Sequence, residues 1–261
     1  MAYSGVDTVI LIGVAGLGVI LGSFLNALLF RFNTGKSVLV GRSACMRCGH
    51  TLASLDLVPL LSFIFLRGRC RYCLTRISWQ YPAVEAAASL LAVLVYLETG
   101  LTLWFVYWLA IWLILLFIVV YDLRHYIIPW SASLTLMALA LLGIVLNLAG
   151  QPGGAMGEWW AGLLLAAPLL LISLISGGRW MGWGDGFLQL SLGWLLGISL
   201  GLTAFLVAFW AGAIVGIALL LMAKNRYTMR SEVPFAPFLI LGCAVAYFLH
   251  VNLFSQLIVL W

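Results

Sequence analysis

The chain has 261 residues, of which 65% are hydrophobic and only 8% are charged. Soluble domains carry about a quarter charged residues, so this composition excludes a soluble globular fold and predicts a membrane protein. The formal net charge of +5 raises the question of a nucleic-acid partner, but eight of the thirteen Lys and Arg residues lie between Arg31 and Arg76, beside one acid, Asp56. Such a loop could contact anionic lipid head groups or an acidic substrate segment, but basic loops in membrane proteins more commonly reflect topology, and that interpretation fits here. We therefore expect membrane lipid, and no nucleic acid, as a partner.

The predicted elements are transmembrane helices. The N-terminal sequence MAYSGVDTV has no basic segment before its apolar run, so this run is expected to remain as a membrane helix rather than a cleaved signal peptide. Uncharged apolar runs of about 17 to 25 residues mark each span. They predict an all-α polytopic membrane protein with about eight transmembrane helices, near residues 8–30, 82–98, 101–121, 131–149, 158–176, 185–199, 201–223 and 236–258. The polar segment 31–81 separates the first two helices, which divides the chain into residues 1–30, 31–81 and 82–261.

The basic residues predict the orientation of these helices. After the basic first loop, the remaining Lys and Arg residues fall in the third, fifth and seventh loops, at Arg124, Arg179, Lys224, Arg226 and Arg230. The segments on the other side contain acids only, at Asp7, Glu98 and Glu158. Because loops rich in Lys and Arg remain in the cytoplasm, the odd-numbered loops are predicted to be cytoplasmic and both termini outside.

Four of the five cysteines predict a metal site in segment 31–81. They form two Cys-x-x-Cys pairs, Cys45 with Cys48 and Cys70 with Cys73, and Gly49 follows the first pair as in a tight turn. Two such pairs can place four thiolates tetrahedrally around one Zn²⁺. A segment of about fifty residues builds little core, so a metal would stabilise it. Because a four-thiolate site has no open position, this zinc is expected to be structural.

Two other interpretations of the cysteines remain open at this point. Disulfide pairing is disfavoured because the loop is predicted to face the reducing cytoplasm. A thiol redox relay through both Cys-x-x-Cys pairs would need the oxidising side of the membrane. The fifth cysteine, Cys243, lies alone in the last predicted span and is expected to be a buried apolar residue.

Two aspartates at the ends of predicted spans are the candidate catalytic residues. Asp122 lies in YDLRHYIIP and Asp185 in GGRWMGWGDGF. Carboxylates at the membrane edge are costly and therefore indicate function. The chain crosses the membrane twice between them, which returns Asp185 to the same cytoplasmic face as Asp122. Two neighbouring carboxylates share a proton, so one can activate water as a base while the other acts as an acid.

The glycines around Asp185, which are Gly182, Gly184 and Gly186, would let a substrate or another helix approach the carboxylate closely. The two aspartates alone are also compatible with a proton or cation path. A polytopic transporter or ion channel with a zinc-stabilised cytoplasmic loop is therefore the alternative interpretation of these residues.

A set of motifs in a fixed order favours the enzyme. They are GSFLNALLFR (22–31), both Cys-x-x-Cys pairs, LRGRCRYCLTRISWQYPAVE (66–85), DLRHYIIP (122–129) and GWGD (182–185). This set resembles the type IV prepilin peptidase family, whose members are GxGD membrane aspartyl peptidases and prepilin N-methyltransferases. The resemblance implies that Asp122 and Asp185 are catalytic and that Cys45, Cys48, Cys70 and Cys73 bind zinc.

The resemblance also implies the substrates and the location. The substrates would be precursors of type IV pilins or type II secretion pseudopilins, which lose a short basic leader. The new N-terminus would then be methylated from S-adenosylmethionine. Such an enzyme is expected in the bacterial inner membrane, with its active site at the cytoplasmic face. No glycine-rich nucleotide motif marks a methyl-donor site, and Gly68 and Arg69 of the basic loop are candidate positions near that function.

Three residues depart from the pattern that the resemblance implies. Met46 replaces a common Pro after the first cysteine, Trp130 replaces Asp or Asn after Ile-Pro, and Phe187 replaces Lys two residues after Asp185. Two polar residues near these motifs have open roles. Glu85 could shape a substrate groove or extend to the surface beside Arg76, and His125 is expected to be a surface residue.

Overall fold

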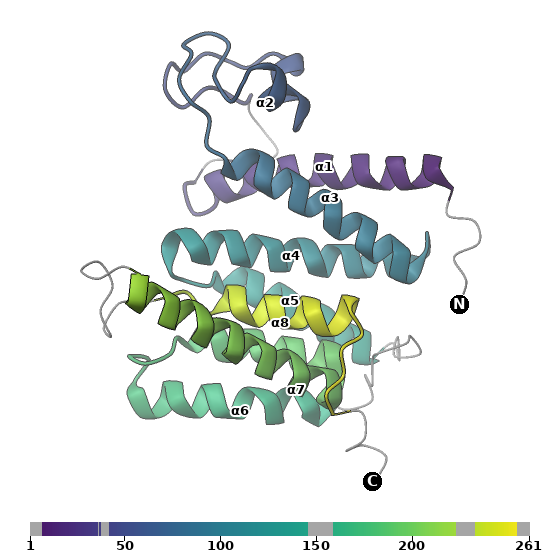
Figure 1. The fold of residues 1–261 in the computed structure, drawn as a ribbon, viewed down its shortest axis with the longest axis vertical. Coiled ribbons are helices and arrows are strands. Elements are labelled where there is room, and N and C mark those ends of the chain that lie inside the picture. The colour runs from purple at the N-terminus through teal and green to yellow at the C-terminus, as the bar shows by residue number, and fades with distance from the viewer. Residues whose placement is uncertain (1–6, 36, 38–41, 146–158, 223–232, 255–261) are drawn as a thin grey trace. The chain divides into compact units, whose positions relative to one another are not determined.

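The computed structural model describes residues 7–35, 37, 42–145, 159–222 and 233–254. These residues form helices, with only isolated bridges in place of strands. The elements are α1 (Thr8–Arg31), η1 (Ser54–Leu57), α2 (Leu61–Phe65), α3 (Gln80–Thr99), α4 (Leu103–His125), α5 (Trp130–Val145), α6 (Trp159–Ser176), α7 (Trp183–Met222) and α8 (Ala236–Phe248) (Figure 1). The predicted all-α class is confirmed.

The described helices are those of a multi-pass membrane protein. Five are long and apolar enough to cross a membrane, namely α1, α3, α4, α6 and α7, while α5 and α8 are shorter apolar helices. In α7, Gly197 has φ 73° and ψ −177°, so two helices meet there at a kink. Glycine tolerates this conformation because it has no Cβ. The predicted boundary between spans six and seven, at residues 199–201, falls close to this kink.

Some predictions concern residues outside the described part of the chain. The predicted ends of spans four and eight include residues 146–149 and 255–258, which are outside it. The same holds for five charged residues used to predict orientation, Lys36, Glu158, Lys224, Arg226 and Arg230. The orientation of the termini therefore stays a prediction.

The chain forms two compact units, Met1–Phe117 and Ile118–Trp261. In the first unit, α1 packs along α3 (Figure 1). A Cβ at Gly18 would lie 2.6 Å from the Cα of Ser89, and a Cβ at Gly22 would lie 2.7 Å from the Cα of Glu85. Small residues at these positions let two membrane helices make backbone contact. The predicted division at residues 30 and 81 is not tested by these units and stays a prediction.

In the second unit, α7 contacts α5, α6 and α8. Glycines again allow the closest contacts, because a Cβ at Gly193 would lie 2.7 Å from the Cα of Gly162 on α6. A Cβ at Gly242 on α8 would clash with the carbonyl of Ala204 on α7. The first turn of α7, which contains Asp185, is therefore part of a closely packed helix.

Candidate active site and metal centre

The two Cys-x-x-Cys pairs form two loops with the same backbone hydrogen bonds. Cys45 and Cys70 each donate an N–H to the carbonyl five residues later, at 2.9 Å, and each accepts from the N–H four residues later, at 2.9–3.0 Å. That fourth residue has positive φ in both loops, 70° at Gly49 and 58° at Leu74. The tight turn at Gly49 was predicted, whereas its repetition at a leucine was not, since leucine rarely adopts this conformation.

The four cysteine sulfurs form one cluster. All four Sγ atoms lie within 4.8 Å of one another, and those of Cys45 and Cys73 are 3.8 Å apart. A tetrahedral zinc with Zn–S bonds of about 2.3 Å would separate its sulfurs by about 3.8 Å. The cysteines are free rather than joined in disulfides. This arrangement can hold a metal ion.

The chemistry of the thiols also fits a cation. Hydrogen bonds between Cys73 and the hydroxyl and backbone of Thr75 lower the pKa of Cys73 to about 6. Backbone hydrogen bonds from Cys48 and Arg47 lower the pKa of Cys45. The pKa of Cys48 instead rises to about 11 despite a backbone hydrogen bond from His50, because desolvation and its hydrogen bonds with Cys45 and Cys73 disfavour its thiolate. A bound cation would favour deprotonation of all four thiols.

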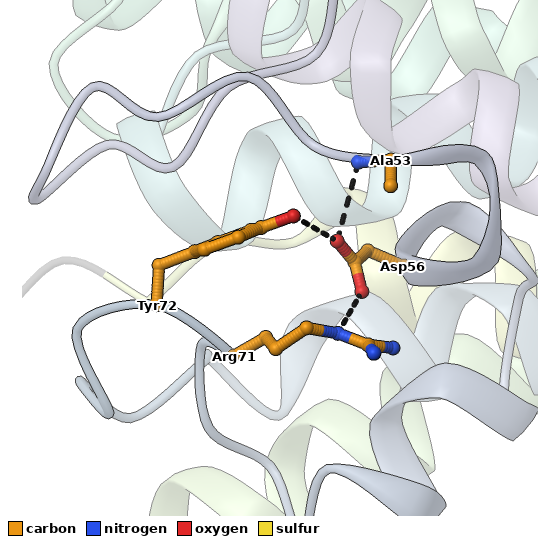
Figure 2. Close-up of polar contacts among 4 residues, drawn as sticks. All are labelled: Ala53, Asp56, Arg71 and Tyr72. Carbon is orange, nitrogen blue, oxygen red and sulfur yellow. Dashed lines mark hydrogen bonds and ion pairs between the residues drawn. The ribbon is translucent and has the colours of Figure 1, made fainter.

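Asp56 links η1 to the second cysteine loop (Figure 2). Its carboxylate accepts from the Nε of Arg71 at 2.7 Å, the hydroxyl of Tyr72 at 3.3 Å and the backbone N–H of Ala53 at 3.2 Å. Desolvation opposes the charge, but the hydrogen bonds from Ala53 and Arg71 outweigh it and hold the pKa of Asp56 below its usual range. The ring of Tyr72 also lies 3.7 Å from that of His50, in the first loop. The two cysteine loops are thus joined by side chains as well as by sulfur.

Asp122 lies in the last turn of α4 and is only 4% exposed. The backbone N–H of Ala236, the first residue of α8, donates to its carboxyl group. A helix N-terminus favours a negative charge. The Oδ2 atom of Asp122 is buried and has no hydrogen-bond partner within the described ranges. A buried oxygen of this kind is available to a proton, a water molecule or a substrate.

Asp185 lies in the first turn of α7, where a short turn from α6 determines its position. Its N–H donates to the carbonyl of Gly182 at 3.3 Å, and the N–H of Gly182 donates to its carboxyl group. Ser173 on α6 is 0% exposed, and its hydroxyl donates to the carbonyls of Met181 at 3.1 Å and Gly182 at 3.3 Å. Ser173 therefore holds the turn that holds Asp185. The sequence analysis missed this serine.

The segments that carry the two aspartates contact each other in the second unit. A Cβ at Gly184 would lie 2.9 Å from the Cβ of Ile128, so the Ile128 side chain packs against Gly184 only because glycine has no side chain. The rings of Trp130 and Phe187 meet edge to face, with centroids 4.9 Å apart. The two carboxylates are close enough to interact electrostatically. The structure thus brings the two candidate residues together.

The other candidate residues have different surroundings. Glu85 is buried and accepts the N–H of Leu60 at 2.8 Å, so it does not extend to the surface beside Arg76. His125 is exposed and its ring stacks on Tyr121 in its own helix, as expected of a surface residue. Gly68 has φ 68°, and a Cβ there would lie 3.0 Å from the ring of Phe63, so packing explains this glycine.

These features define an all-helical membrane protein with paired aspartates at helix ends and a four-cysteine loop. Family models match both the segment that contains the cysteines and the segment that contains the aspartates. Residues 17–99, which include the cysteines, match the Bacterial Peptidase A24 N-terminal domain. Residues 107–217, which include both aspartates, match the Type IV leader peptidase family.

The chain belongs to the type IV leader peptidase family. It is 31% identical over 234 residues to the prepilin leader peptidase/N-methyltransferase of Bacillus subtilis (strain 168), covering 88% of this chain and 90% of the relative. It is 33% identical over 263 residues to the protein of that name from Burkholderia pseudomallei (strain 1026b), with 89% and 83% covered. For the Myxococcus xanthus (strain DK1622) protein of that name, identity is 34% over 224 residues, with 83% and 64% covered. No solved structure matches the chain.

Proposed function

We propose that this protein is a membrane aspartyl endopeptidase that removes the basic leader from type IV prepilins or type II secretion pseudopilins. Asp122 and Asp185 would be its catalytic pair. The observation that carries this proposal is the meeting of their two segments, through Ile128 with Gly184 and Trp130 with Phe187. The family supplies the reaction, because the relatives reported above are named prepilin leader peptidases.

The carboxylates perform general acid–base catalysis in this proposal. One aspartate removes a proton from the attacking water, and the other donates a proton to the oxygen of the scissile carbonyl. A shared proton keeps one member of the pair neutral and the other charged at neutral pH. The Oδ2 of Asp122, which has no hydrogen-bond partner among the described residues, would carry this proton or accept a hydrogen bond from the water.

The metal and the methyl donor have separate roles in the proposal. Zinc bound by Cys45, Cys48, Cys70 and Cys73 would have no open coordination position, so it would stabilise the loop rather than activate water. The names of the relatives include N-methyltransferase. We infer that this chain also methylates the new N-terminus, with S-adenosylmethionine supplying the methyl group.

The charge pattern supports a location for the reaction. Basic loops are retained in the cytoplasm, so we propose that both aspartates lie at the cytoplasmic face of the bacterial inner membrane and that both termini lie outside. Prepilin leaders are basic and would remain on the same side. The relatives reported above give no support to a transporter or channel, and we do not propose one.

Substitution of either aspartate tests the pair. Asp122→Asn and Asp185→Asn should each abolish leader removal, because an amide cannot exchange a proton as a carboxyl group does. The proteins would be co-expressed with a prepilin and the prepilin N-terminus read by mass spectrometry, which reports cleavage and methylation together. Glu98→Gln, which neutralises an acid at the end of α3, is the matched control and should retain cleavage. Near wild-type processing by either Asn variant, at normal expression, would show that the assignment is wrong.

A further inference from the structure

Residues 57–65 present an apolar surface that the proposed function does not use. The side chains of this apolar surface are exposed by between 37% and 80%, at Leu57, Val58, Leu61, Ile64 and Phe65. A loop surrounded by water would be expected to bury side chains of this size, and contiguous apolar patches mark contact sites. The surface belongs to the first unit and lies between two membrane helices in the sequence, α1 and α3.

Helix α2 has an inner face and an outer face. On the inner face, the ring of Phe63 lies 5.0 Å from that of Trp79 and against Gly68. These contacts leave Leu61, Ile64 and Phe65 on the outer face, where all three are exposed. The exposure of the outer face is therefore a consequence of how α2 is anchored.

A hydrogen bond fixes the level of this segment relative to the membrane helix α3. The carboxylate of Glu85 accepts the N–H of Leu60 at 2.8 Å. Glu85 is five residues beyond Gln80, the first residue of α3, and a rise of about 1.5 Å per residue places it about 7.5 Å along the helix. Leu60 has φ 59°, and the N–H of Leu61 returns to the carbonyl of Pro59 at 2.6 Å. The chain thus makes a tight turn at the level of the second turn of α3.

Charged and aromatic residues at the same end of α3 match the membrane interface. Arg67 and Arg69 follow α2 and are exposed, and residues 31–81 contain eight Lys and Arg but one acid. Anionic lipid head groups attract basic segments of this kind. Trp79, just before α3, is 76% exposed, and tryptophan is enriched at the level of the head groups.

We propose that residues 57–65 insert into the interface of an anionic bilayer, with Leu61, Ile64 and Phe65 among the acyl chains. The four-cysteine loop is then docked on the membrane beside α1 and α3 instead of extending freely into water. Continuity with the membrane helices, the Glu85 anchor and the basic residues all favour lipid as the occupant of this surface.

Photocrosslinking from single positions tests the occupant. A photoreactive phenylalanine analogue would replace Phe65 in the full chain, which would be reconstituted with a prepilin in vesicles of phosphatidylcholine and phosphatidylglycerol. Mass spectrometry of the adducts identifies what the side chain touches. Lipid adducts are expected, and they should be enriched in phosphatidylglycerol. Predominant adducts to residues 118–261 or to the prepilin would overturn the proposal, because the surface would then be a protein interface.

Two sets of controls keep the test specific. The same analogue at Phe63, on the inner face of α2, should crosslink within the chain near Trp79 rather than to lipid. Glu85→Gln retains an acceptor oxygen for the Leu60 N–H and should preserve lipid crosslinking from position 65. Glu85→Leu removes the acceptor and should reduce lipid crosslinking severalfold. Equal lipid yields from positions 63 and 65, or from both Glu85 variants, would contradict the anchored geometry. These readouts do not depend on peptidase activity, so they remain informative if the proposed function fails.

Discussion

Replacing Ser173 by alanine tests whether the turn from α6 to α7 positions Asp185. The substitution removes the hydroxyl that donates to the carbonyls of Met181 and Gly182. Gly182 is the residue whose N–H donates to the Asp185 carboxyl group and whose carbonyl accepts from the Asp185 N–H. Ser173→Ala should therefore loosen the carboxyl group without removing any atom that touches the substrate.

The size of the effect follows from the burial of the partners. A neutral hydrogen bond contributes about 1 kcal/mol, and a buried acceptor left unsatisfied costs about 1–3 kcal/mol. Gly182 is exposed, so water can replace part of the lost bond, and the lower value applies. If this cost falls on the transition state, a loss of about 1 kcal/mol lowers kcat about fivefold. The KM for prepilin should not change, because Ser173 is buried away from the surface.

The assay compares kcat and KM for cleavage with methylation of an already cleaved pilin. Ser191→Ala is the matched control, since Ser191 is equally buried but its hydroxyl donates within its own helix, to the carbonyl of Phe187 at 3.1 Å. Ser173→Cys has nearly the volume of serine but is a weak donor, so it should behave like Ser173→Ala. Equal kcat values for the Ser173→Ala and Ser191→Ala variants, or a loss of methylation as large as that of cleavage, would refute the positioning role.

Three further predictions concern the same two sites. Gly184→Ala should lower cleavage more than methylation, as measured by mass spectrometry of the pilin N-terminus. The new Cβ would lie 2.9 Å from the Cβ of Ile128 and would push the two aspartate segments apart, so unchanged cleavage would contradict this contact. Leu74→Gly should slow the release of zinc to a chelator, because glycine relieves about 1 kcal/mol of strain at φ 58°; faster release than wild type would count against the shared loop geometry. Cys45→Ser/Cys48→Ser should remove the metal, as metal analysis would show, and should reduce methylation more than cleavage. The reason is that methyl transfer needs a polar pocket for its donor, and the loop is the largest polar segment of the chain. Equal losses of the two activities with intact helices would refute this division.

The helices and the cysteine cluster could be predicted because their signals are local. An uncharged apolar run identifies a membrane helix whatever it packs against. The spacing of two Cys-x-x-Cys pairs is enough to predict a four-thiolate metal site. The break at Gly197 was predicted to within a few residues, because an apolar run this long exceeds one membrane span and has to be divided. These features needed no knowledge of tertiary contacts.

The supports of the sites could not be predicted because they join residues that are far apart in the sequence. Asp56 was recognised as a lone acid, but nothing local indicates that it accepts from Arg71 and Tyr72. Serine is common near helix ends, so nothing in the sequence indicates that the Ser173 hydroxyl donates to the turn before Asp185. Glu85 had two open roles, and its actual partner is a backbone N–H in the loop.

The aromatic pair Trp130 and Phe187 shows how a structure changes the meaning of a sequence difference. In the sequence these residues are two separate departures from the family pattern, one after each aspartate motif. In the structure their rings meet edge to face at 4.9 Å, so the two departures form one contact between the aspartate segments. Edge-to-face aromatic pairs contribute about 0.5–1.5 kcal/mol beyond their buried area, and they need no charge. A polar residue at either position alone would leave its apolar partner without this contact. The joint presence of both aromatic residues is therefore consistent with the proposed aspartate pair, although the polar residues that the family resemblance implies at these positions are absent.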